Sequence, residues 1–247
     1  MNTSHVGSLK VSSRLIGALF LLGFLSYGVG FALVTSVIGA PDFLAMIAAH
    51  QTTLVIGAFL MLLNSVVDIG KGVLFFPILE NHNKHTALAY LAAMIVEVVL
   101  LAVGVLYLLM LVPLAQLGVA GGQASLAWAK SMASFLVQSN NMAYQVAEMT
   151  LGLGALFLTA LLFRIRLIPR FLSGWGFIGY AILMTGTIAE IFGIHIGLIL
   201  SIPGGLFEVA LGFCLLIKGF QPEAYGQEDK SPLVRPGREM DAAGNCI

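Results

Sequence analysis

Apolar residues gather in six long runs along the chain, and polar residues gather between these runs. A transmembrane helix needs about 20 mostly apolar residues to cross a hydrocarbon core of roughly 30 Å. Runs of this kind are found at Leu15–Ile38, Thr53–Ile78, Ala87–Val112, Met142–Phe163, Phe171–Phe192 and Ile196–Ile217. The pattern therefore predicts an all-α fold, a polytopic bundle of about six transmembrane helices within a membrane domain at residues 15–220.

Basic residues indicate how these spans are oriented. With both termini inside the cell, the outer loops hold only Lys130, whereas the inner segments hold Lys10, Arg14, Lys84, Arg164, Arg166, Arg170 and Lys218. This is the asymmetry that the positive-inside rule describes. We therefore expect a multi-pass protein of the inner (cytoplasmic) membrane, with a cytoplasmic N-terminal segment at residues 1–14. The first apolar run is longer than a usual signal core, so we interpret it as a retained helix.

Two further stretches differ from the spans. From Gln221 the sequence is rich in Pro, Gly and charge and cannot bury a core, so residues 221–247 are expected to form a disordered cytoplasmic tail. The longest external connection is Pro113–Asn141. Within it, Ala124–Val137 has apolar residues at helical spacing opposite Lys130, which predicts a candidate interfacial helix in the external loop.

Composition supports the membrane interpretation and excludes one class of partner. Of the 247 residues, 59% are hydrophobic and only 10% are charged, whereas soluble domains are about a quarter charged. Lys+Arg and Asp+Glu are equal at 12 each, so no overall basic field attracts nucleic acid. The two cysteines lie in an apolar run and in the polar tail, and they do not indicate a disulfide.

Three arginines stand close together between the fourth and fifth spans: Arg164, Arg166 and Arg170. Pro169 breaks the helix there, and Trp175 is placed to act as an aromatic anchor at the membrane interface. The arginines fit a cytoplasmic turn that orients the protein. The alternative is contact with an anionic lipid or phosphate.

The sequence around this turn resembles a known family. The block LIPRFLSGWGFIG at Leu167–Gly179 is followed by a span that ends PGGLFEVALGFCLLIKGF at Pro203–Phe220. Both stretches resemble a bacterial and archaeal family of six-span integral membrane proteins described as a domain of unknown function, over about Arg14 to Phe220. The resemblance implies a helical membrane fold. It implies no activity, substrate or catalytic residue.

Ionisable side chains within the spans are the main chemical clue. A charge at mid-bilayer costs several kcal/mol, so it needs a partner, water or a proton. In the second span Asn64, Asp68 and Lys71 follow at i, i+4 and i+7 and share one helical face, where Asp68 and Lys71 can pair. Counting 1.5 Å per residue from the helix ends places Glu97 and Glu208 near the midplane, at the depth of Asn64. These side chains are therefore expected to meet in one polar layer.

A second polar cluster is expected nearer the outer surface. Glu148 lies in the outer part of the fourth span with Tyr144 and the Asn140–Asn141 pair, and Glu190, His195 and His50 lie toward outer ends. Together the two layers predict an outward-opening cavity lined by Asn64, Asp68, Lys71, Glu97, Glu148 and Glu208. Because several carboxylates share the membrane interior with one lysine, some should be protonated or hydrated. The alternative is that each group only bonds a neighbouring helix, which contributes ~0.6–2 kcal/mol per contact.

The Pro203–Gly204–Gly205 sequence lies about one turn before Glu208. It predicts either a kink that serves packing or a broken helix whose carbonyls face a ligand.

Catalytic chemistry finds little support in the sequence. His82 and His85 have helical i, i+3 spacing but occupy a solvated turn, and the remaining histidines are scattered. The G-x-S-x-G, P-loop and H-E-x-x-H motifs are missing from the sequence. We therefore assign no catalytic residue, no metal and no cofactor.

The sequence predicts contact with the lipid bilayer and the binding or movement of a small molecule, lipid or ion through the cavity. The alternative function is a non-enzymatic membrane scaffold, and the third is an intramembrane lipid-modifying enzyme. The predicted partners include no nucleic acid, and no oligomeric state is indicated.

Overall fold

A computed structural model describes residues 3–221, and within them the chain is all-α, as predicted. Within these residues, six helices are long and apolar enough to cross a membrane, and one short helix, α2, joins the first two. The helices are α1 (Thr3–Ile38), α2 (Phe43–Ala49), α3 (Gln51–Glu80), α4 (Lys84–Ala120), α5 (Gly122–Ile165), α6 (Arg170–Ile191) and α7 (Gly197–Ile217). The tail predicted beyond residue 221 lies outside the described residues.

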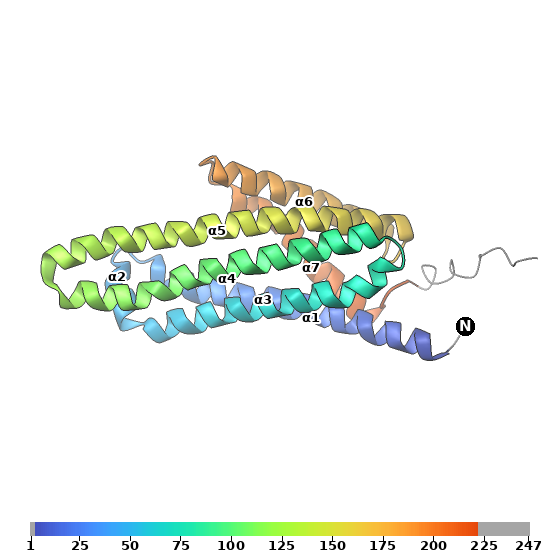
Figure 1. Cartoon of the computed structure of the whole chain (residues 1–247), viewed down its shortest axis with the longest axis horizontal. Helices are drawn as coiled ribbons and strands as arrows, with labels where there is room; N and C mark the ends of the chain where they lie inside the picture. The colour runs from blue at the N-terminus through green and yellow to red at the C-terminus, as the bar shows by residue number, and fades with distance from the viewer. Residues whose placement is uncertain (1–2, 222–247) are drawn as a thin grey trace, which may run out of the picture.

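The six long helices form a closed ring. Each packs against the next in chain order, from α1 and α3 through α6 and α7, and α7 closes the ring against α1. Figure 1 shows the long helices side by side along the longest axis. We call the end where α5 turns into α6 the arginine end. We call the opposite end, where α4 turns into α5, the hairpin end.

The α4–α5 hairpin is longer than the predicted spans. α4 and α5 have 37 and 44 residues, about 55 and 66 Å at 1.5 Å per residue. α6 and α7 have only 22 and 21 residues, about 33 and 32 Å, which matches a bilayer core. The hairpin therefore extends beyond α6 and α7 at the hairpin end, as Figure 1 shows.

The interfacial helix expected at Ala124–Val137 is helical, but it is not a separate element. It forms the first part of α5, which runs without a break to Ile165. Ala129, Ala133 and Leu136 of this segment are buried in the hairpin-end packing with α4, whereas Met132 is exposed. The loop was also predicted to begin too early, at Pro113, because α4 continues through Pro113 to Ala120.

Other boundaries differ in smaller ways. α1 begins at Thr3, so most of the segment expected to precede the first span is helical. α7 continues through Pro203, and the backbone of Pro203 and Gly204 lies against Gly179 of α6, where an added Cβ would come within 3.1 Å of the Pro203 carbonyl oxygen. The proline–glycine sequence therefore lies at a close α6–α7 contact within a continuous helix.

The turn between α5 and α6 is fixed by its backbone conformation, by buried side chains and by a backbone hydrogen bond. Arg166 ends α5 in the left-handed region at φ 55°, a conformation that is uncommon for residues other than glycine. Leu167 and Ile168 are fully buried, and the Leu167 carbonyl accepts a hydrogen bond from the Gln221 N–H at 2.9 Å. Trp175 packs partly buried against the core.

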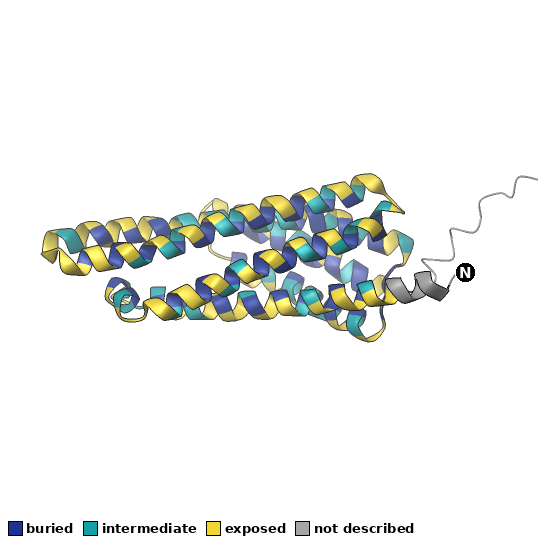
Figure 2. Cartoon of the chain, turned by 60° about the horizontal axis from the view of Figure 1, so that its bottom comes forward, coloured by how far each residue is buried: buried dark blue, intermediate teal, exposed yellow. Residues whose placement is uncertain are grey.

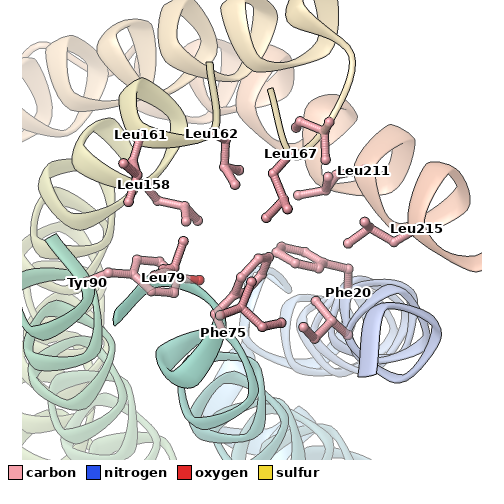
Figure 3. Close-up of a cluster of buried hydrophobic side chains, with 14 of the residues drawn as sticks. Phe20, Phe75, Leu79, Tyr90, Leu158, Leu161, Leu162, Leu167, Leu211 and Leu215 are labelled. Carbon is pink, nitrogen blue, oxygen red and sulfur yellow. The ribbon is translucent and has the colours of Figure 1, made fainter. Parts of the chain in front are cut away.

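Buried apolar side chains form two separate cores. The arginine-end core receives residues from all six long helices. It includes the aromatic rings of Phe20, Phe75, Tyr90, Phe207 and Phe220, and Figure 3 labels the first three of them. The hairpin-end core, which includes Val34, Leu44, Leu54, Leu108 and Ala133, draws only on α1 to α5. α6 and α7 therefore contribute to the core at one end only.

Many large apolar side chains point outward instead of into these cores. Phe59, Val66, Leu106 and Phe171 are 57–81% exposed in the isolated chain, and Figure 2 shows exposed residues along the outer faces of the helices. A soluble monomer rarely exposes such continuous apolar surface. Lipid chains cover such faces in a membrane protein.

The α1–α3 crossing generates a first prediction. A Cβ added to Gly57 would lie 2.8 Å from the Gly30 carbonyl oxygen, whereas a Cβ on Gly28 would meet nothing within 4 Å. Gly57→Ala should therefore lower the melting temperature of the purified protein, because overpacking costs about 1–3 kcal/mol. Gly28→Ala, the control on the facing helix, should leave it unchanged or raise it. Equal melting temperatures for the two variants would contradict this packing.

Candidate intramembrane binding site

A polar layer lies between the two apolar cores. It surrounds a cavity of about 170 Å³ whose lining comes from α1, α3, α4, α5, α6 and α7. All six residues predicted from the sequence line this cavity: Asn64, Asp68, Lys71, Glu97, Glu148 and Glu208. The structure thus brings together residues that are up to 144 positions apart in the chain (208 − 64). Whether they bind a ligand stays a prediction.

The three α3 residues form a continuous polar chain. The Asn64 amide donates to Asp68 Oδ2 at 2.6 Å, and Lys71 Nζ pairs with Asp68 Oδ1 at 2.5 Å. Their spacing of four and three residues places them on one face of the helix. All three are at least 92% buried, so these bonds satisfy polar groups that have little contact with solvent.

Glu208 of α7 connects these three α3 side chains to α6 and α7. Lys71 Nζ lies 3.9 Å from Glu208 Oε2, and the Tyr180 hydroxyl donates to Glu208 Oε1 at 2.6 Å. The Lys71 ammonium also lies 4.6 Å from the centre of the Phe20 ring, within cation–π distance. Side chains of α1, α3, α6 and α7 therefore meet around one ammonium group.

Glu97 is the least satisfied group in the layer. It is only 3% exposed, and its Oε2 atom has no hydrogen-bond partner within residues 3–221. An unpaired buried carboxylate is costly, and in native structures such a group calls for an explanation. Because Glu97 lies on the cavity wall, a molecule in the cavity is the natural candidate for its missing partner.

Gly23 of α1 allows this layer to close. A Cβ at this position would lie 2.9 Å from the Asn64 side-chain oxygen and 3.8 Å from Lys71 Nζ. A larger residue would enter the space that Asn64 occupies. The site therefore requires a residue without a side chain at position 23 of α1.

A second cavity of about 250 Å³ adjoins the first toward the hairpin end. We call it the vestibule. Its wall includes Asn141, Glu190 and His195 of the cluster expected from the sequence. The two cavities share Tyr27, Tyr144, Glu148, Leu183 and Ser201. The rings of Tyr27 and Tyr144 stack at 5.9 Å between centres, so an aromatic pair lies where the cavities meet.

The vestibule contains only part of the expected outer cluster. Glu190 accepts hydrogen bonds from the His195 ring at 2.9 Å and from the Gly197 N–H at 2.9 Å, which connects the end of α6 to the start of α7. Asn140 lines a smaller space beside Gly104. His50 lies in neither wall, because it joins α2 to α3 at the hairpin end. Its inclusion in the cluster was wrong.

The two cores explain why the vestibule lies at this end. At the arginine end, apolar side chains of all six long helices fill the ring. At the hairpin end α6 and α7 have no part in the core, and Figure 1 shows α6 diverging from α5 in that direction. The vestibule occupies the space between α6–α7 and the faces of α1 and α5.

The three arginines lie elsewhere. Arg164, Arg166 and Arg170 are exposed at the arginine end, and the Arg170 guanidinium lies 5.4 Å from the centre of the Phe163 ring. Arg164 also lines a shallow groove of about 340 Å³ between α5 and α6 with Phe163, Gly174 and Phe177. The expected contact with an anionic lipid stays a prediction.

Sequence reasoning missed several wall residues. Tyr27, Tyr180 and Ser201 line the cavities or bond to the residues that do. Each carries a hydroxyl group inside an apolar run, and a buried tyrosine hydroxyl usually finds a partner. Their position in the sequence could therefore have marked them as candidates. Which carboxylate each hydroxyl faces depends on how the helices pack.

Six apolar helices around a polar interior define a class: this is a multi-pass helical membrane protein. More specifically, the chain belongs to the family described as Domain of unknown function (DUF4386), which matches residues 15–219. The family match agrees with the resemblance found in the sequence. No curated protein matches the chain, and no solved structure matches it.

The ion pairs generate a second prediction. Lys71→Met should destabilise the purified protein by about 3–5 kcal/mol, because it leaves buried Asp68 and Glu208 without their cation. Asp68→Asn combined with Lys71→Met should recover part of this loss. The control is Lys84→Met, which removes an exposed pair with Glu80 at 3.8 Å and should cost less than about 1 kcal/mol. Thermal unfolding in detergent measures all three, and equal losses for the two lysine variants would contradict the buried network.

Proposed function

We propose that this protein binds a small solute in its central cavity and moves it across the membrane. The observation that carries this proposal is the Glu97 carboxylate, whose Oε2 atom has no hydrogen-bond partner in the described part of the chain and which is 97% buried on the wall of a cavity large enough for a ligand. Ionisable groups inside a membrane are costly and commonly mark a solute or proton path.

The size of the cavity favours binding over helix packing. Polar residues that only hold helices together can satisfy one another without leaving space between them. Here about 170 Å³ remains at the centre of the layer, which corresponds to about five or six water molecules at roughly 30 Å³ each. A hydrated ion or a small organic molecule would fit this volume.

The position of the cavity also fits transport. Solute sites of transporters lie near the bilayer midplane, and access alternates between the two sides. The central cavity adjoins the vestibule on the side of the hairpin end. On the opposite side, the apolar core separates the cavity from the arginine end of the protein. Movement of a solute would therefore require the aromatic contacts of that core to open.

We further propose that the protein lies in the cytoplasmic membrane with both termini and the arginine end facing the cytoplasm. The charge asymmetry across the spans supports this orientation. The vestibule would then face outward.

Cysteine labelling tests the orientation. In a background with Cys214 and Cys246 replaced by serine, His195→Cys at the hairpin end should react with a membrane-impermeant maleimide in intact cells. Arg166→Cys should react only after the membrane is permeabilised, because it lies at the opposite end. The reverse pattern would invert the proposed orientation.

Native mass spectrometry of protein released from native membranes tests the binding function. Wild-type protein should carry a stoichiometric small molecule or ion, and Glu97→Gln should lose it while retaining its fold, because the amide removes the charge with little change in shape. The matched control is Glu80→Gln, which removes a partly exposed carboxylate outside the cavity. Protein without a bound species in every case, with variants that differ only in stability, would favour the scaffold function.

A further inference from the structure

We propose that the solute is an amphipathic amine, a molecule with one protonated amine and an apolar chain. This inference rests on the proposed function, because it names the ligand class of the same site. Four features of the two cavities support it: their charge, the arrangement of their ion pairs, the aromatic pair between them and the apolar wall of the vestibule.

The first feature is charge. The central cavity is lined by four carboxylates, Asp68, Glu97, Glu148 and Glu208, and by one ammonium group, that of Lys71. Among residues 3–221, no arginine or histidine lines it. A wall with more acids than bases favours a positively charged guest and disfavours an anion.

The second feature is how the one cation is used. Lys71 is already shared between Asp68 at 2.5 Å and Glu208 at 3.9 Å. Glu97 and Glu148 take part in no ion pair among the described residues. These two carboxylates are therefore the ones that lack a counter-charge, and an ammonium group in the cavity would supply it.

The third feature is the aromatic pair. Tyr27 and Tyr144 stack where the cavities meet, and both line the cavities together with Glu148. An ammonium group is attracted by the face of an aromatic ring as well as by a carboxylate. This combination suits an organic amine better than a metal ion, which prefers several oxygen ligands.

The fourth feature is the wall of the vestibule. Phe31, Met142, Leu183 and Leu198 provide apolar surface there, and Leu198 is 68% exposed in the isolated chain. Glu148 lies in the walls of both cavities. A molecule with its amine at Glu148 can therefore place an apolar chain along the vestibule, where α6 and α7 diverge from the hairpin-end core.

A set of probes with similar chain length tests this class. Octylamine, octanol and nonanoate carry the same eight-carbon alkyl chain on different polar groups, and octanoate is the shorter carboxylate; each is added to the full-length protein in phosphatidylcholine nanodiscs. Octylamine should raise the melting temperature in a saturable manner, whereas octanol and the two carboxylates should not. Ethylamine, which lacks the chain, should bind at least about tenfold more weakly than octylamine, because each buried CH₂ contributes about 0.8 kcal/mol.

Two variants localise the effect. Glu148→Gln removes the charge and Leu198→Trp fills the vestibule, and each should weaken octylamine binding by about tenfold or more. The matched controls are Glu80→Gln and Leu206→Trp, which lie outside both cavities. The controls also correct for unspecific partition of the amine into the bilayer.

The outcomes separate this inference from the proposed function. Saturable binding of octanol or of either carboxylate that Leu198→Trp removes would overturn the amine class and leave solute binding intact. No saturable effect of octylamine, or an effect equal in Glu148→Gln and wild type, would also overturn it. A native ligand lost in Glu97→Gln supports the function independently, and its mass and charge identify its class.

Discussion

The Lys71 ammonium group, buried with Asp68 and Glu208, is the interaction on which the rest of the structure depends. An isolated charge in this position would be too costly to keep in a membrane. Its two carboxylate partners come from α3 and α7, on different sides of the ring. The polar layer can therefore exist only when the ring is closed, and closing the ring is what satisfies the lysine.

The two ends of the helix ring differ because the helices differ in length and in how they pack. α6 and α7 are just long enough for a bilayer, whereas α4 and α5 are longer and pair along their length. All six helices meet in the arginine-end core, but only α1 to α5 share the hairpin-end core. The polar cavity is thus bounded on one side by packed aromatic rings and on the other by the vestibule.

Close helix contacts hold the polar groups in register. Gly23 lies against Asn64, Gly30 against Gly57, and Gly179 against the Pro203 carbonyl. Without an apolar driving force between helices in lipid, such close contacts and interhelical hydrogen bonds are what stabilise a bundle. The same glycines bring the carboxylates, the lysine and the tyrosine hydroxyls within reach of one another, so packing and the candidate site are not separate features.

The sequence by itself determined the six spans and the polar face of α3, because hydropathy and helical spacing are local properties. It also indicated the depth of Glu97 and Glu208, since helix rise is constant. Only the tertiary structure decided that Tyr180 bonds Glu208, that Glu97 Oε2 has no partner within residues 3–221 and that Ala124–Val137 is the first part of α5. These depend on the rotation and length of neighbouring helices, which packing between distant segments sets and no local pattern encodes.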